Sequence, residues 1–370
     1  MAHIAHLTSA HPRRDTRIFL KQCRSLAAAG YNVSLVVADG LGNEALDGVN
    51  VIDTGKSRGR RDRMLHATRR VLQSALDLDA DLYHLHDPEL LPIALTLKRR
   101  GKRVIFDSHE DLPAQILTKP YLRAGLRAPI SGAVSLFERF ACARMNAIAT
   151  ATPAIQRKFA GHGIYSLDIN NFPLLGELEA DVPWTDKQKE VCYVGGIAEI
   201  RGIREVVAAM ALSKSGARLN LGGEFPKGTL RAEVAQDPGW SKVKELGFLS
   251  REDVRAVLGR SAAGIVTFLP APNHIDAQPN KMFEYMSAGI PVIASNFPLW
   301  REIIEGNDCG LCVDPLDSSA IAEAIDWLVE NPESARRKGE NGRRAVHERY
   351  NWCAEEKKLL GLYERVLSQT

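Results

Sequence analysis

Short apolar segments alternate with longer amphipathic segments along almost the whole chain. The apolar segments are nearly continuously hydrophobic, which is typical of parallel strands covered by helices on both faces. Between the first two lies a segment, 16–30, with apolar residues at helical spacing and Gly30 placed to end a helix. The expected strands are 3–9, 31–39, 50–55, 82–87, 103–109 and 147–153 in the first half, and 190–196, 217–224, 244–249, 263–270, 289–295 and 309–315 in the second.

The second half repeats the plan of the first, and 370 residues are enough for two domains of ordinary size. Residues 170–190 are rich in turn formers and charge, as in a linker. We therefore predict an α/β protein with two Rossmann-like, doubly wound domains facing across a cleft. Ligands of such sheets bind at the carboxyl ends of the strands.

Composition narrows the class of protein. The chain is 45% hydrophobic and 25% charged, and its net charge of only +3 argues against a dedicated nucleic-acid binder. We find no apolar run that would span a bilayer and no basic leader followed by an apolar block, and expect a cytoplasmic protein. The CxxC at Cys309 and Cys312 has no second pair, which favours two plain thiols over a zinc site.

Positive charge gathers in the first half of the chain, in segments 56–70 and 119–129. Such a surface could rest on anionic lipid or meet an acidic acceptor, and a solvated helix face explains it equally well. If this surface does rest on anionic lipid, we expect peripheral contact with the inner face of a membrane.

The turn after the first strand of the second half has the features of an anion site. Gly195 and Gly196 end the strand, Arg201 follows, and a helix is expected from Ile203. Backbone amides at a helix N-terminus together with a cation bind anions. The dinucleotide fingerprint GxGxxG is absent, so the sequence does not support a nicotinamide dehydrogenase. The alternative to an anion site is a tight turn with a solvated arginine.

The segment DAQPNKMFEYMSAGIPVIAS, 276–295, adds a second cation and two carboxylates. We expect a helix over 279–288 with Lys281 in its first turn, where the helix dipole costs a cation up to about 1 kcal/mol. A bound polyanion would reverse that sign, so Arg201 and Lys281 could clamp a diphosphate. Glu284, one turn on, could accept ribose hydroxyls, and Asp276 could reach a sugar; taken singly, each is equally a helix-surface acid or a turn former.

The same segment resembles the signature of the retaining family-4 glycosyltransferases with GT-B fold, Glu, seven residues, then Glu. The likeness runs from HPRRDTRIFLKQCRSLAAAGYNVSLV near the start to FPLWREIIEGNDCGLCVDPLDSSAIAEAIDWLVENP and the closing helix. It implies that the last helix crosses back to the N-terminal domain. The implied domains are an acceptor-binding one, 1–172 plus helix 353–370, and a nucleotide-sugar-binding one, 173–352.

The resemblance also implies roles for the residues that match its motifs. Glu284 would hold the ribose, Asp276 would contact the donor sugar, and Arg201 with Gly202 would grip the diphosphate. Gly247-Phe248-Leu249 stands at the base-binding loop. The donor-binding set is therefore Glu284, Gly196, Gly202, Phe248, Leu249, Met282 and Phe283, and the catalytic set is His109, Asp276, Arg201 and Lys281.

The chain departs from the family pattern at three places. Asp276 is one methylene shorter than the usual glutamate, and Gly196 stands where a second phosphate-binding arginine is common. Ala277-Gln278-Pro279 replaces the usual Gly-Phe-Gly. We hypothesise that Lys281 supplies the missing cation, and altered donor preference stays open.

In the first domain His109 ends an expected strand and matches the family's active-site histidine. A neutral histidine there could bond the donor sugar or guide the acceptor hydroxyl, although Glu110 or Asp111 could equally satisfy a loop histidine. The acceptor-binding candidates are Asp15, Arg17 and His86. For Asp15 an N-cap role is the alternative, and for His86 a turn role beside Pro88.

These observations predict a retaining, metal-independent glycosyltransferase that moves a sugar from a nucleotide-diphosphate sugar to a carbohydrate or lipid-linked hydroxyl acceptor, in polysaccharide or glycolipid biosynthesis. No Asp-x-Asp pair stands at the expected strand ends, so cationic side chains must stabilise the departing phosphate. Two rivals remain: a nucleotide-sugar epimerase of the same fold, and a non-catalytic nucleotide-sugar-binding protein.

Overall fold

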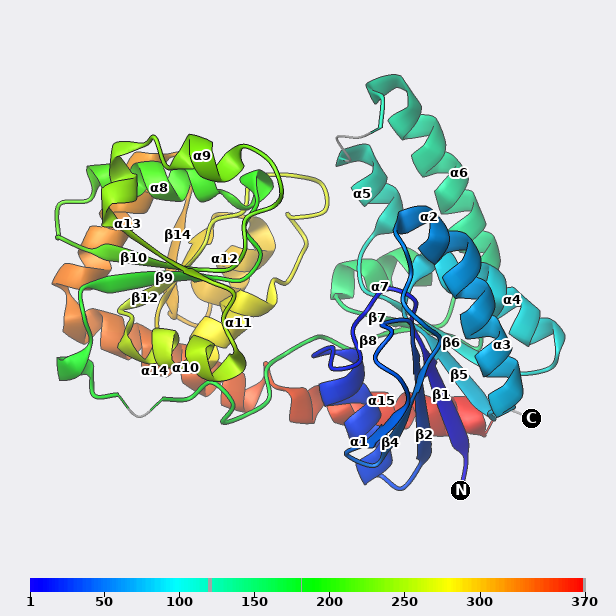
Figure 1. Ribbon diagram of the computed structural model, residues 1–370. Coiled ribbons are helices and arrows are strands. Elements are labelled where there is room, and N and C mark those ends of the chain that lie inside the picture. Colours follow the sequence, from blue (N-terminus) through cyan, green and yellow to red (C-terminus); the bar gives the residue numbers. More distant parts are fainter. Residues whose placement is uncertain (119–121, 181, 369–370) are drawn as a thin grey trace. The chain divides into compact units, whose positions relative to one another are not determined.

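The computed structural model describes residues 1–118, 122–180 and 182–368, and the chain forms two compact units (Figure 1). Unit 1 comprises Met1–Asn171 together with the C-terminal segment from Ala354, and unit 2 comprises Phe172–Cys353. Part of the basic segment 119–129, at Lys119, Pro120 and Tyr121, lies outside the described residues.

Unit 1 is built on a sheet with the strand order β3-β4-β2-β1-β5-β6-β7-β8. Its neighbouring strands pair in parallel except β3, which pairs antiparallel to β4. The strands are β1 (His3–Leu7), β2 (Asn32–Val37), β3 (Glu44–Leu46), β4 (Val49–Asp53), β5 (Leu82–Leu85), β6 (Arg103–Ser108), β7 (Ala147–Thr150) and β8 (Ser166–Asp168).

The helices of unit 1 connect these strands. The first begins with a π-helical segment, Ile18–Cys23, that continues into α1 (Arg24–Ala28). The others are α2 (Arg60–Asp62), α3 (Thr68–Leu78), α4 (Leu91–Arg99), α5 (Leu112–Thr118), α6 (Ala124–Cys142), α7 (Pro153–Ala160) and the closing α15 (Trp352–Leu367).

Unit 2 holds an all-parallel sheet with the order β11-β10-β9-β12-β13-β14. Its strands are β9 (Glu190–Val194), β10 (Arg218–Gly222), β11 (Val243–Gly247), β12 (Ala263–Val266), β13 (Val292–Ser295) and β14 (Gly310–Val313). Its α-helices are α8 (Ile203–Leu212), α9 (Leu230–Val234), α10 (Arg251–Arg260), α11 (Asn280–Ser287), α12 (Pro298–Ile304), α13 (Ser318–Glu330) and α14 (Pro332–Glu348).

The predicted fold class is confirmed, because every strand expected from an apolar segment is present in a parallel sheet. Both faces of the unit 2 sheet are covered, and two separate clusters of buried side chains line it. The short strands β3 and β8 were not expected, since their residues carry little apolar patterning.

Each sheet reverses its strand order at one point. In unit 1 the chain moves outward from β1 through β2 and then returns to β5 on the other side of β1; in unit 2 it does the same around β9 and β12. The crevice at the carboxyl ends of such strand pairs is where doubly wound sheets bind ligands. The turns after β1 and β9 are therefore the places to look for function.

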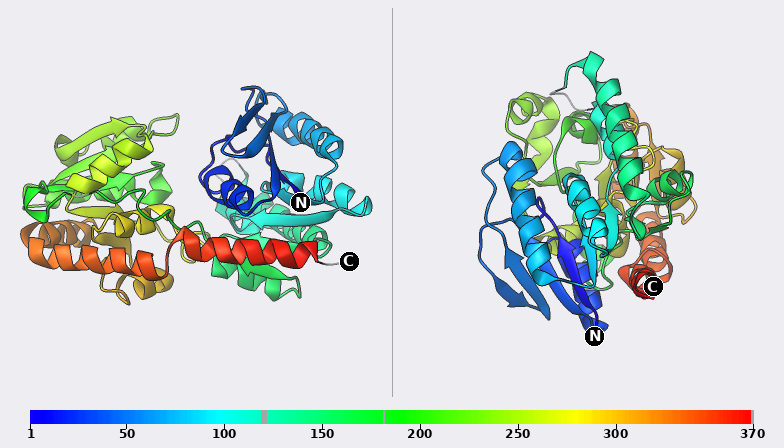
Figure 2. Two further views of the ribbon diagram at one scale, coloured as in Figure 1. Left: turned by 90° about the horizontal axis from the view of Figure 1, so that it is seen from below. Right: turned by 90° about the vertical axis from the view of Figure 1, so that its right-hand side faces the viewer.

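Helix α15 packs on unit 1, as the predicted return of the last helix requires (Figure 2). Its Tyr363 is fully buried, and the hydroxyl lies 2.6 Å from His84 Nδ1 and 3.1 Å from His6 Nε2. No helix of the described residues is long and apolar enough to cross a membrane.

Candidate functional site

The turn after β9 requires glycine. Gly195 has a φ of +108° and Gly202, directly before α8, has a φ of +76°, a backbone conformation that side chains disfavour. A Cβ on Gly202 would lie 2.0 Å from the Thr267 carbonyl oxygen. The turn and α8 can therefore approach the end of β12 this closely only without a side chain at this position.

Lys281 of α11 faces this turn from beneath. Only 7% of the residue is exposed, its Nζ lies 3.6 Å from the centre of the Tyr193 ring, and it would be 3.7 Å from a Cβ on Gly195. Among the described residues no hydrogen-bond partner reaches this buried Nζ. Burial lowers the pKa of Lys281 well below its usual value, and the nearby charge of Arg201 lowers it further.

Arg201 stands in the same turn, in the 3-10 segment Glu199–Arg201. Its Nη1 donates to the Gly196 carbonyl oxygen at 3.0 Å and would be 2.2 Å from a Cβ on Gly196. The glycine at 196 thus makes room for the Arg201 guanidinium. Two cations flank consecutive glycines at the switch point of unit 2, which is an arrangement suited to an anion.

Glu284 lies one turn further along α11, where Arg251 holds it. Arg251 Nη1 donates to Glu284 Oε1 at 2.7 Å, while its Nε and Nη2 bond Glu177 at 2.7 and 2.9 Å. Sequence reasoning missed Arg251 and Glu177, because nothing in the local sequence ties either residue to Glu284. Arg251 thus orients the Glu284 carboxylate through Oε1.

Asp276 is exposed in the loop that precedes α11. The backbone beside it is fixed, because the indole Nε1 of the fully buried Trp300 donates to the Ala277 carbonyl oxygen at 2.7 Å. Asp276 is therefore presented to solvent on an anchored loop.

The remaining donor-site predictions divide into exposed and buried residues. Phe248 is 78% exposed, whereas Leu249 packs against the hydrophobic core. Met282 and Phe283 are 0% and 1% exposed, so their side chains belong to that core, and their predicted donor contacts stay a prediction. Both stand between Lys281 and Glu284 in the sequence of α11.

In unit 1, His109 follows β6 at the carboxyl edge of the sheet. Its Nε2 lies 3.1 Å from Asp107 Oδ2, and its side chain is 20% exposed. The partner is thus Asp107 rather than Glu110 or Asp111. The Arg17 guanidinium and His109 hold the pKa of the fully buried Asp107 well below its usual value, although burial alone would raise it.

The structure revises the acceptor candidates. Arg17 is buried, donating Nε and Nη2 to Asp107 at 2.9 and 2.7 Å and Nη1 to the Ile169 carbonyl oxygen, so it is not presented to an acceptor. The side chain of His86 is also fully buried. Asp15 accepts from the amides of Arg17 and Ile18 at 2.8 and 2.9 Å, which is the N-cap alternative.

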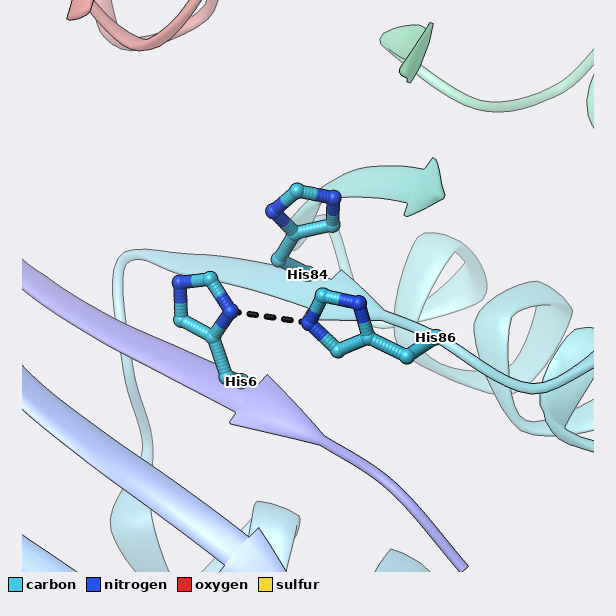
Figure 3. A group of neighbouring side chains, drawn as sticks. All are labelled: His6, His84 and His86. Carbon is cyan, nitrogen blue, oxygen red and sulfur yellow. Dashed lines mark hydrogen bonds between the residues drawn. The ribbon is translucent and has the colours of Figure 1, made fainter. Parts of the chain in front are cut away.

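Three buried histidines lie behind His109 on one face of β1 and β5 (Figure 3). His86 Nδ1 lies 3.3 Å from Asp107 Oδ2, and His86 Nε2 lies 2.8 Å from His6 Nδ1. Because Asp107 is a carboxylate, His86 Nδ1–H donates to it. His86 Nε2 then accepts from His6 Nδ1–H, His6 Nε2 accepts from the Tyr363 hydroxyl, and that oxygen accepts from His84 Nδ1–H.

The same logic sets the tautomer of His109. Since its Nε2–H donates to Asp107, its Nδ1 carries the lone pair and can accept a proton from a ligand hydroxyl.

Two groups of side chains in the described residues have the spacing of metal ligands: His6, His84 and His86, and His86, Asp107 and His109. The histidine group fits a metal poorly. His86 is stacked on His6 and His84 with interplanar angles of 14° and 28°, so the in-plane lone pairs do not converge. In the second group Arg17 and Gln22 already donate to Asp107.

An open cavity of about 750 Å³ lies beside the carboxyl ends of β1 and β2 in unit 1. His11 is on its wall and pairs with Asp87 at 3.0 Å; the His11 pKa is raised because Asp87 outweighs the lowering effect of burial. The basic segment predicted from the sequence contributes to this cavity. Its lining is Ser9, Ala10, His11, Pro12, Ala38, Asp39, Lys56, Ser57, Gly59 and Arg63.

Comparison with solved structures defines the class of fold. Sucrose-phosphate synthase from Thermosynechococcus elongatus matches with a TM-score of 0.80 and 19% identity over 100% of both chains. Anabaena HepE in complex with UDP-glucose matches with a TM-score of 0.75 and 14% identity over 99% of this chain and 100% of that one. The GT-B fold is therefore confirmed.

Family models identify the chain more closely. Residues 176–345 match "Glycosyl transferases group 1" and residues 16–172 match "Glycosyl transferase 4-like domain". The chain belongs to the group 1 glycosyltransferases, and the predicted family and enzyme class are confirmed.

Curated relatives match over part of their length. The O-antigen chain mannosyltransferase C of Escherichia coli is 30% identical over 43% of this chain and 42% of its own. The MMP alpha-(1->4)-mannosyltransferase of Mycolicibacterium hassiacum is 25% identical over 33% of this chain and 28% of its own. The matched regions thus span less than half the length of these two relatives.

Replacing Arg17 by Met should lower the free energy of unfolding by about 3–5 kcal/mol, because Asp107 would be left buried without its main counter-charge. Urea unfolding followed by circular dichroism measures this change. The control is Arg24→Met, which breaks an exposed pair with Asp47 and should cost at most about 1 kcal/mol. An unchanged urea midpoint with a raised acceptor KM would restore Arg17 as an acceptor contact.

Proposed function

We propose that this protein transfers a hexose from a nucleotide-diphosphate sugar to a hydroxyl acceptor with retention of the anomeric configuration. The observation that carries the proposal is the buried Lys281 Nζ, which faces the Gly195 turn without a partner among the described residues. A buried ammonium is costly unless a counter-charge is supplied. The donor diphosphate supplies it, with Arg201 in the same turn.

Each donor-site residue then has a physical role. Arg201 and Lys281 stabilise the charge that develops on the leaving diphosphate, which is the step a metal ion would otherwise assist. Glu284, oriented by Arg251, accepts the ribose hydroxyls. Asp276 contacts the donor sugar from its anchored loop, and the exposed Phe248 offers an aromatic face to the base.

We assign acceptor binding to unit 1 and donor binding to unit 2. His109 Nδ1 accepts a hydrogen bond from a sugar or acceptor hydroxyl, since Asp107 holds the proton on Nε2. The cavity lined by His11, Lys56 and Arg63 is the place for an acceptor that carries hydroxyl groups and negative charge. A carbohydrate or lipid-linked acceptor at a membrane face fits this chemistry.

Replacing Arg201 by Ala should lower kcat by about 10²–10³-fold while nucleoside affinity changes little, because the guanidinium acts on charge that forms in the transition state. Steady-state transfer assays and nucleoside titration measure the two effects. Arg204→Ala is the matched control: Arg204 lies three residues further along, in the first turn of α8, and pairs with Glu199 and Glu233.

The same assay separates the rival functions. Interconversion of the donor sugar without product on any acceptor would indicate the epimerase, and donor binding without turnover would indicate the non-catalytic protein. Equal kcat values for Arg201→Ala and Arg204→Ala would remove Arg201 from the site.

Diphosphate binding should take up a proton at Lys281. Burial lowers the pKa of the free amine, and a bound anion favours the ammonium form and raises that pKa again. Above the lowered pKa, the affinity for a nucleoside diphosphate should therefore increase as pH falls, by at most about tenfold per pH unit.

Calorimetric titration with the diphosphate in buffers of different ionisation enthalpy measures this proton uptake. Lys281→Met should abolish the uptake and weaken binding. Uptake that persists in the Met variant would assign the proton to another group.

A further inference from the structure

Helix α6 of unit 1 turns large apolar side chains to solvent. Leu136 is 70% exposed, Leu126 51%, Phe140 48% and Phe137 40%. Helical spacing places four of the helix's apolar residues on one stripe, because the intervals between them are seven, four and three: Leu126, Ala133, Phe137 and Phe140. Leu136 lies beside Phe140, one turn earlier. Such an apolar stripe on a surface helix marks an interaction site.

The helix does have a normal inner face. Ser131, Glu138, Ala141 and Cys142 are buried against unit 1, and Glu138 pairs there with Lys158. The outer stripe is therefore additional to the packing that holds α6 in place. Figures 1 and 2 show that its N-terminal turns extend beyond the body of unit 1, beside α5.

The exposed charged side chains on α6 and at its ends are all positive. Arg123, Arg139 and Arg144 are exposed, whereas Glu138 is the helix's one acidic residue and is buried. The Arg144 guanidinium stacks on the Phe140 ring, 3.6 Å from its centre. Guanidinium groups recognise phosphate through paired hydrogen bonds.

We propose that the outer face of α6 docks on a membrane that contains anionic lipid, with Leu126, Leu136, Phe137 and Phe140 entering the interface and the arginines meeting lipid phosphates. An in-plane helix with an apolar face and basic flanks binds in this manner without spanning the bilayer. Of the two basic segments named in the sequence analysis, 119–129 overlaps the first turns of α6, so the proposal assigns the predicted membrane contact to that segment and the helix that follows it.

The proposal is tested by co-sedimentation of the full chain with vesicles of phosphatidylcholine containing about one third phosphatidylglycerol, and with pure phosphatidylcholine. The wild type should bind the anionic vesicles and lose most of that binding at high salt. Leu136→Gln combined with Phe140→Gln should lower the partition coefficient at least about tenfold, since two large apolar groups no longer enter the lipid.

Charge and position are tested by two further variants. Arg139→Glu combined with Arg144→Glu should abolish the preference for anionic vesicles. Leu316→Gln is the control, because Leu316 is 60% exposed in unit 2 and should not affect partition. These positions are exposed, so thermal melting should show that each variant stays folded.

Three results would overturn the proposal: wild-type protein that stays in the supernatant with anionic vesicles, an equal loss in Leu316→Gln, or size-exclusion data in which Leu136→Gln with Phe140→Gln merely dissociates a dimer. Nucleotide binding of the same variants should be unchanged. A negative result for membrane docking would therefore not affect the proposed donor site. A negative result for nucleotide binding would likewise not affect the test of membrane docking.

Discussion

A lysine amine buried without a hydrogen-bond partner among the described residues is the constraint on which the proposed donor site depends. Lys281 is placed by α11, whose neighbouring residues Met282 and Phe283 are packed in the core, and only 7% of Lys281 is exposed. The Tyr193 ring gives partial compensation through its π face. On the function proposed above, the donor diphosphate at the Gly195 turn would supply the larger compensation.

Unit 1 buries a group of the opposite charge, the carboxylate of Asp107, and surrounds it with hydrogen-bond donors. Asp107 receives donors from Arg17, Gln22, His86 and His109, and a chain of histidines continues from it to Tyr363 of α15. This chain ties the C-terminal helix to the residues behind His109 and fixes the tautomer of each ring. The same buried pairing explains why Arg17, a surface candidate by sequence, is a structural residue.

The sequence was sufficient for the fold because each apolar segment is long, continuous and bounded by turn residues, as in 31–39 and 190–196. It also singled out the turn at Gly195 and Lys281, which lie close together in the structure, while their role in donor binding stays a prediction. It was insufficient wherever a role depends on a distant partner. Within unit 2 Arg251 meets Glu284 and Glu177, and within unit 1 Asp107 meets Arg17, over long separations in the sequence that local patterning does not encode.

The same limit explains the corrections. Met282 and Phe283 stand between Lys281 and Glu284 in the sequence, but their side chains pack in the core. His86 follows a strand as His109 does, yet it is buried beside His6 of β1 and Asp107 of β6. Spacing alone does not distinguish the exposed end of one strand from the covered end of the next.

The most direct test of the central claim is a calorimetric titration of UDP, GDP and ADP into the wild type and Glu284→Ala. The account predicts that one nucleotide binds, and that Glu284→Ala weakens it by about 10–100-fold because the ribose loses a charged hydrogen-bond acceptor. No binding of any of the three nucleotides, or equal binding in the variant, would contradict the assignment of the unit 2 switch point as the donor site.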